Sequence, residues 1–104
     1  MKARTAVRQL GGQRVINAFA KKVSAKYGVS VAIVPCVNEE EPSDNWLNVV
    51  IETPNGLFDK DGHSTELDKA TDEVIDFLHK KDLVMDWECG GDGDTGPIES
   101  YRVY

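Results

Sequence analysis

The chain has few of the residues that build covalent or metal-based sites. Its 104 residues include two cysteines, Cys36 and Cys89, and neither stands in a C-x-x-C pair or at another spacing typical of zinc ligands. No apolar run of about seven residues follows the basic N-terminus, so the sequence shows no secretion signal. We therefore expect two reduced thiols in a cytoplasmic protein, with no metal and no cofactor.

Two further patterns are missing. No stretch approaches the roughly 20 consecutive apolar residues of a membrane helix, so we expect no membrane contact. No glycine is followed by the Lys-Ser/Thr pair of a phosphate-binding loop. Because no motif specifies a reaction, we predict a protein without catalytic activity.

Acidic residues are absent from one part of the chain, residues 1–26, which carry seven lysines and arginines. The other 78 residues carry all 18 acids and five bases. The formal net charge of −6 therefore combines +7 at the start with −13 in the rest. Such an asymmetry bears on partners and association rather than on the fold.

Apolar residues make up 40% of the chain, which is ordinary for a globular protein, and we predict a single domain over residues 1–104. Two segments have the apolar period of helices: 13–27, ended by Gly28, and 65–80, capped by Thr65. Residues 1–12 form either a short helix, capped by Thr5 and ended by Gly11-Gly12, or a separate basic arm. The predicted buried faces are Val15, Ile16, Phe19, Ala20, Val23 and Tyr27 in the first long helix, and Leu67, Ala70, Val74, Phe77 and Leu78 in the second.

Strands are predicted between and after these helices. The continuous apolar run 29–35 favours a central strand, and 46–52 alternates, with Leu47, Val49 and Ile51 on one face. A short strand through Leu57 and Phe58 is optional. Two more strands follow at 83–88 and 98–104, joined by a flexible Gly-rich hairpin loop at 89–97.

Short hairpin connections imply a mainly antiparallel sheet, and two helices with single apolar stripes can both cover one face of it. The predicted fold class is therefore α+β. It is a two-layer domain with a sheet of four or five strands and two helices on one face, in the order α-β-β-(β)-α-β-β.

One string resembles a known motif. Leu57-Phe58-Asp59-Lys60-Asp61-Gly62 resembles the first motif of the haloacid-dehalogenase-type phosphotransferases. The resemblance would make Asp59 a nucleophile and Asp61 an acid/base, with both able to hold Mg²⁺. However, His63 stands where that family has threonine, and the 42 residues after Gly62 are too few for its parallel α/β fold. We therefore predict a turn with solvated acids.

Acidic residues gather at three places that we predict to bind a partner: a loop, a stripe along the second long helix, and the hairpin tip. They are Glu39, Glu40, Glu41 and Asp44; Asp68, Asp72 and Asp76; and Asp92 and Asp94. The leading hypothesis is a small non-catalytic inhibitor or adaptor that docks on the basic, nucleic-acid-binding surface of another protein. This hypothesis requires that the acids gather on one side and are not neutralised by the cations of residues 1–26.

The basic segment supports an alternative. Clustered lysines and arginines on a helix supply most of the affinity of non-specific nucleic-acid binding. In that reading the protein is nucleic-acid-associated and its contacts are Arg8, Arg14, Lys21 and Lys22. The same cations could instead lie against the acidic body of their own chain or of a second copy, so a homodimer is left open.

Overall fold

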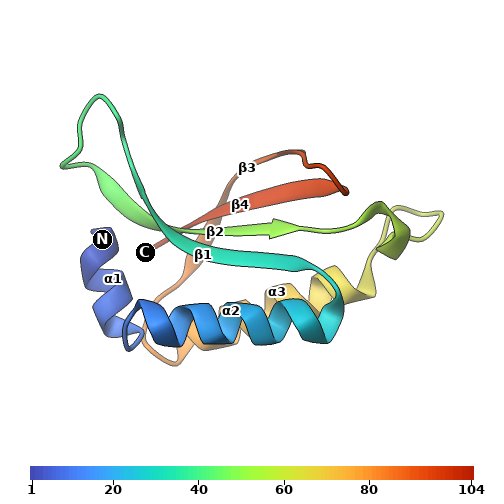
Figure 1. Ribbon diagram of the computed structural model, residues 1–104, viewed down its shortest axis with the longest axis horizontal. Coiled ribbons are helices and arrows are strands. Elements are labelled where there is room, and N and C mark those ends of the chain that lie inside the picture. The colour runs from blue at the N-terminus through green and yellow to red at the C-terminus, as the bar shows by residue number, and fades with distance from the viewer.

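Four antiparallel strands form one layer, and the helices lie along one face of it (Figure 1). The computed structural model describes residues 1–104. Its strand order is β1-β2-β4-β3, so the two edge strands are β1 and β3. This architecture confirms the predicted α+β class and the approximate order of elements. The helices are α1 (Ala3–Gln9), α2 (Gln13–Tyr27) and α3 (Thr65–His79), and the strands are β1 (Ser30–Val37), β2 (Asn45–Glu52), β3 (Met85–Asp92) and β4 (Pro97–Val103).

The opening segment forms α1 and packs on the body. Ala3, Ala6 and Leu10 are buried, and the Ala3 N–H donates to Asn45 Oδ1 at 3.0 Å. The predicted cap at Thr5 is wrong, because the N-cap is Lys2, three residues earlier, and no side chain caps the helix. Gly11 and Gly12 end the helix as predicted, at φ of 99° and 106°, which few other residues adopt.

The second helix, α2, buries the predicted stripe only in part. Ile16, Ala20 and Val23 are buried, whereas Val15 is 47% exposed. Val15 lies at the margin of the predicted arc, beyond the reach of the sheet. Gly28 ends the helix in the left-handed conformation, as predicted.

The N-cap of the third helix, α3, lies one residue before the predicted one. The Ser64 hydroxyl accepts a hydrogen bond from the Leu67 N–H at 3.2 Å, so Ser64, and not Thr65, is the N-cap. The predicted buried face is confirmed: Ala70, Val74 and Leu78 are fully buried. Leu67 and Phe77 are partly buried against the same core.

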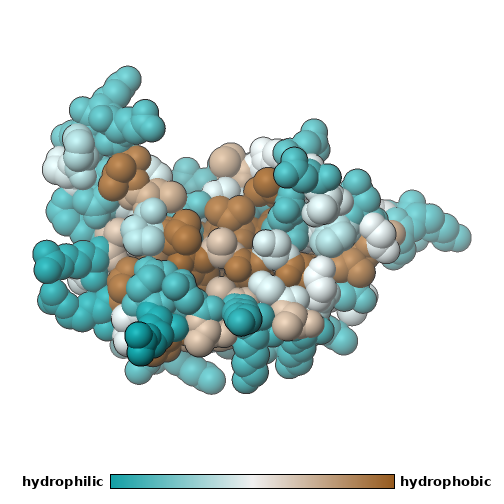
Figure 2. Space-filling model, viewed as in Figure 1, coloured by the Kyte–Doolittle hydropathy of each residue, from teal (hydrophilic) through white to brown (hydrophobic).

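Strand β2 carries the predicted core face, since Leu47, Val49 and Ile51 are all fully buried. The prediction that the apolar run 29–35 is a central strand is wrong, because β1 lies at the edge of the sheet. Its apolar character has another cause: α2 packs along it, and buries Val31 and Ile33. The apolar residues on its other side remain open, and an apolar band crosses the face shown in Figure 2 where β1 lies.

Two of the outer backbone groups of β1 are occupied by side chains of the same chain. The Val31 N–H donates to Ser24 Oγ at 2.9 Å, and the Ile33 carbonyl accepts from Gln13 Nε2 at 3.1 Å. Both side chains belong to α2. Pro35, further along the strand, has no N–H to offer. This edge is therefore protected by its own chain.

The optional strand through Leu57 and Phe58 does not form. Asn55–Leu57 is a 3₁₀ turn, η1, so the sheet has four strands. Strand β3 extends beyond its predicted end to Asp92. The hairpin tip is not free, because Thr53 N–H donates to Pro97 O at 3.0 Å and Asn55 N–H donates to Thr95 O at 2.9 Å.

Candidate partner-binding surfaces

The two long helices carry opposite charge. Arg14, Lys21, Lys22 and Lys26 lie on α2, which has no acid, whereas five of the 15 residues of α3 are acids and only Lys69 is a base. The helices lie side by side under the sheet (Figure 1). The helical layer is therefore basic along α2 and acidic along α3.

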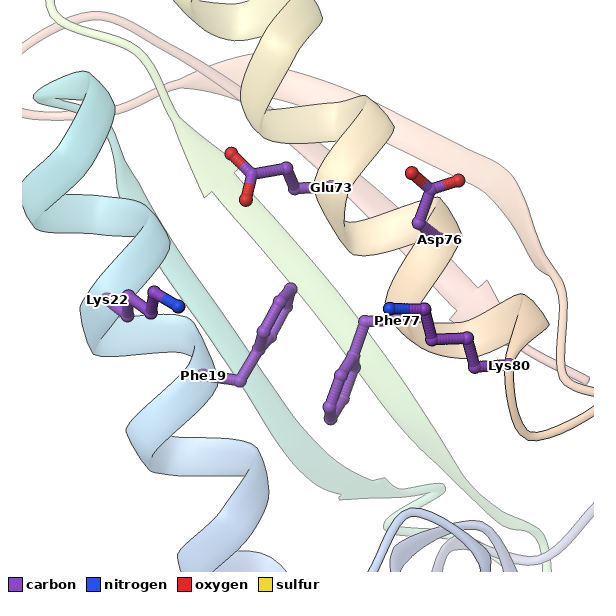
Figure 3. Close-up of a pocket in the computed structure, with 6 residues that line it drawn as sticks. All are labelled: Phe19, Lys22, Glu73, Asp76, Phe77 and Lys80. Carbon is purple, nitrogen blue, oxygen red and sulfur yellow. The ribbon is translucent and has the colours of Figure 1, made fainter.

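The seam between these helices holds a shallow depression of about 290 Å³. Figure 3 shows Phe19 from α2 and Phe77 from α3 side by side at its centre, stacked with 3.9 Å between ring centroids and 6° between ring planes. Charged side chains of both signs surround the rings. They are Lys22 and Lys80, and Glu73 and Asp76. Ligand pockets are lined mainly by apolar side chains, whereas four of the six residues here are charged, so the depression fits a helix–helix seam better.

Glu73 links the helices. A hydrogen bond from the Tyr27 hydroxyl lowers the pKa of its carboxyl, and Lys26, whose Nζ lies 3.2 Å from Glu73 Oε2, lowers it further. The same carboxylate raises the pKa of Lys26. Only one acid of the chain, Glu73, forms an ion pair with a cation of residues 1–26. The basic segment therefore does not neutralise the acidic body by direct pairing.

All nine predicted partner-binding acids are exposed, but the structure does not bring them together. The loop with Glu39–Glu41 and Asp44 lies at the start of β2, where the Lys2 ammonium donates to Ser43 O. The hairpin tip with Asp92 and Asp94 lies at the other end of β2, beside Thr53. The predicted set is thus divided between the two ends of the sheet and α3.

A second acidic element is β3, which the predicted set covers only at Asp92. It also carries Asp86 and Glu88, it has no lysine or arginine, and seven of its eight residues are exposed. The Glu88 carboxylate lies 3.4 Å from Arg102 Nε, and the Arg102 guanidinium lies 4.0 Å from the Trp46 ring centroid. The sequence held no signal for this exposure, because Met85, Trp87 and Cys89 alternate with Asp86 and Glu88 as they would in a half-covered strand.

The acids of α3 and β3 belong to the same side of the molecule. The sheet order places β4 and β3 on the side away from β1, and Tyr101 on β4 packs against the same core as Leu67 and Phe77 of α3. Asp68 and Asp72 lie on this helix. Partial burial raises the pKa of Tyr101, with Glu99 adding to the effect. Together α3 and β3 form an acidic half, opposite the basic α2.

The segment with Asp59 and Asp61 is a turn between η1 and α3. Asp59 Oδ1 accepts from the N–H groups of Asp61 and His63, both at 2.9 Å, and the bond from His63 lowers the pKa of Asp59. The carboxylate is thus engaged in holding its own turn. The motif resemblance requires an Asp at the end of a strand in a parallel sheet, and here no strand precedes the turn and every strand pair is antiparallel.

The alternative, nucleic-acid-binding residues are also dispersed. Arg8, Arg14, Lys21 and Lys22 are all exposed. Arg8 lies on α1, however, and Lys22 faces Glu73 and Asp76 across the seam (Figure 3). Arg14 and Lys21 remain on the part of α2 that points away from α3.

No three His, Cys, Asp or Glu side chains are grouped so that they could hold a metal ion. None of the helices has the length and apolar character that a membrane crossing requires. Comparison with known proteins found no matching family, no matching curated protein and no matching solved structure. The surfaces of the molecule are therefore the basis on which its function is inferred.

Proposed function

We propose that this chain is a non-catalytic protein-binding domain, an inhibitor or adaptor that docks its acidic half on a basic surface of another protein. Nucleic-acid-binding proteins present a surface of this kind, because a basic patch is their electrostatic footprint. The observation that carries the proposal is the charge of α3 and β3, which together hold eight acids and one lysine.

The unpaired state of these acids supports docking. Of the eight, only Glu73 and Glu88 form ion pairs with cations of the chain. The others keep their field in solvent, where it speeds the approach of a positive partner and disfavours partners of like charge. The acidic loop with Glu39–Glu41 is excluded from this surface, because it lies at the end of the sheet where Lys2 of α1 also lies.

The test is a comparison of two variants with the same change of charge. Asp68→Asn/Asp72→Asn/Asp86→Asn alters the acidic half, and Glu39→Gln/Glu40→Gln/Glu41→Gln alters the distant loop. Each protein is immobilised and exposed to lysate of the source cells at low and high salt, and retained proteins are identified by mass spectrometry. We expect basic proteins that bind at low salt, are retained by the loop variant and are lost by the α3–β3 variant. Equal retention by both variants would overturn the proposal.

One observation favours the alternative function, since α1 and α2 together carry cations and no acid. In that case the protein is retained on heparin, and Arg14→Ala/Lys21→Ala reduces the salt concentration needed for elution. Lys22→Ala/Lys26→Ala, which removes the same charge at the seam with α3, is the matched control and has a smaller effect. Failure of the protein to bind heparin at low salt removes this alternative.

A further inference from the structure

Strand β3 has a free edge whose outward backbone groups can be identified from the pairing. Val84 and Tyr104 exchange two hydrogen bonds, N–H to O in both directions, at 2.9 and 2.8 Å. In an antiparallel ladder such pairs alternate with pairs that make no bonds across the ladder. By this alternation, Asp86 bonds Arg102 across the ladder. Met85 opposite Val103 and Trp87 opposite Tyr101 make no bonds across it. The N–H and C=O groups of Met85 and Trp87 therefore point away from β4.

The pairing of β3 with β4 is interrupted by a bulge between Trp87 and Cys89, and the outward groups beyond it can be identified in the same way. Gly93 N–H donates to Gly96 O at 2.7 Å, which fixes the phase of the ladder from the hairpin end. Counting back along β3 from Gly93, the N–H and C=O groups of Asp92 and Gly90 also point away from β4. Four residues of β3 thus offer free backbone groups at intervals along the whole strand. No side chain of another element donates to or accepts from them.

Trp87 provides an apolar contact on this edge. It is 60% exposed, and its indole N–H donates to Glu99 on the neighbouring β4. The ring reaches along the strand toward Gly90, where a Cβ would lie 3.5 Å from Trp87 Cζ2 and 3.3 Å from Glu99 Oε2. A flat aromatic ring held in this way on an edge strand can receive an apolar side chain or a cation.

The charges of the strand select what can pair with it. Asp86, Glu88 and Asp92 repel a second copy of β3, so the edge is closed to self-pairing. They attract an extended segment that carries lysine or arginine. Asp86 lies opposite Arg102 on β4, and Asp92 lies opposite Pro97. Because Arg102 and Pro97 are an odd number of residues apart, their side chains are on opposite faces of the sheet, and the acids of β3 are therefore on both faces.

We propose that β3 is a docking strand: an extended, basic segment of the partner adds to its edge as a fifth strand. The segment hydrogen-bonds the outward groups of Met85, Trp87, Gly90 and Asp92, and its cations meet Asp86, Glu88 and the ring of Trp87. This inference rests on the proposed function and specifies where and how the acidic half binds. It goes beyond charge attraction, because it requires the backbone of the partner to be free and extended.

Three synthetic nine-residue peptides separate backbone pairing from charge. The first alternates lysine and threonine, the second has glutamate in place of lysine, and the third is the lysine peptide with four consecutive central nitrogens methylated. Methylation removes N–H donors on both edges of the peptide and leaves its charge unchanged. Binding is followed by NMR titration, and amide hydrogen exchange is measured in the free and saturated protein.

We expect the lysine peptide to bind and to slow exchange at Met85, Trp87, Gly90 and Asp92. The methylated peptide is expected to bind at least about tenfold more weakly, since it loses several hydrogen bonds, and the glutamate peptide not at all. Among protein variants, Asp86→Asn/Asp92→Asn weakens binding several-fold, whereas Glu39→Gln/Glu40→Gln, with the same change of charge, does not.

The outcomes distinguish the two proposals. If both lysine peptides bind equally well and exchange at β3 is unchanged, the docking strand is wrong, although charge-driven docking of the acidic half stands. If the lysine and glutamate peptides bind equally well, or the loop variant weakens binding as much as the β3 variant, docking by the acidic half is wrong as well.

Discussion

The two edges of the sheet are protected in different ways. Along β1 there is no charge, and protection comes from the chain itself: Ser24 and Gln13 occupy outward backbone groups, and Pro35 removes one. Along β3 no side chain occupies the outward groups, and protection comes from Asp86, Glu88 and Asp92. The protection of the first edge acts on any strand, whereas that of the second acts only on strands that carry acids.

This difference shows how a small fold can keep one edge available for binding without aggregating. A proline or an intramolecular hydrogen bond acts on every incoming strand alike, because it removes the donor or acceptor itself. A carboxylate leaves the donors and acceptors in place and opposes only like charge. An acidic edge is therefore at once a defence against self-association and a means of selection. The following experiments test whether the two edges differ in this sense.

Hydrogen exchange should show the largest difference. The Val31 N–H points outward from β1 but is bonded to Ser24 Oγ, whereas the Trp87 N–H points outward from β3 into solvent. We expect the Val31 amide to exchange at least about 100-fold more slowly than that of Trp87, after correction for intrinsic rates. NMR-detected exchange in the free protein measures both amides. Similar protection of the two would show that the edges are not different.

Truncation of a side chain on each edge strand should give the next largest difference. Ile33 on β1 is 1% exposed, so Ile33→Ala should lower the free energy of unfolding by about 2–5 kcal/mol. Trp87→Ala removes a larger side chain, but one that is mostly in solvent, and should cost less than about 1 kcal/mol. Urea unfolding of both variants measures this. A cost at Trp87 equal to that at Ile33 would mean that β3 is part of the core.

The hydrogen bond that protects β1 can be removed alone. Ser24→Ala leaves the Val31 N–H without its partner and should cost about 1–3 kcal/mol if that group stays buried. It should also bring exchange at Val31 toward the rate at Trp87, which makes the two edges alike. Ser30→Ala, at the exposed start of β1, is the matched control and should change neither quantity. Unchanged exchange at Val31 in the Ser24 variant would contradict the account given for β1.

The parts of the fold that the sequence predicts are those set by local period. Leu47, Val49 and Ile51 alternate, and Ala70, Val74 and Leu78 recur at helical spacing, so their buried faces follow from neighbours in the chain. The position of β1 at the edge of the sheet cannot be predicted from its sequence. A continuous apolar run indicates that the strand is buried on both sides, but not which elements bury it. Here α2 supplies part of what a second neighbouring strand would supply in a central position.

The sequence predicts which acids of the candidate surface are exposed, but not how they are arranged in space. Exposure of the nine acids follows from their charge. Which of them lie together depends on the strand order, which places Asp92 in the acidic half and leaves Glu39 at the other end of β2. Asp86 and Glu88 were missed as site residues because, in a strand assumed to be half covered, acids are simply its solvent side. Only the structure shows that nothing covers β3.

The smallest predicted effect concerns the boundary between the basic and acidic helices. The pKa of Glu73 is lowered in the folded protein by Tyr27 and Lys26, below the unfolded value of about 4.3. Its contribution to stability is therefore present above pH 4.3 and is lost as the pH falls through the folded pKa. Glu73→Gln should be less stable than the wild type at pH 7, and the difference should shrink as the pH falls below the unfolded pKa and through the folded one. Asp72→Asn, one position earlier and exposed, is the control and should not differ from the wild type in this pH-dependent way. Urea unfolding at several pH values measures the difference. If it persists unchanged at low pH, the contact between the two helices at Glu73 is not electrostatic, and the division into a basic and an acidic helix has no part in holding them together.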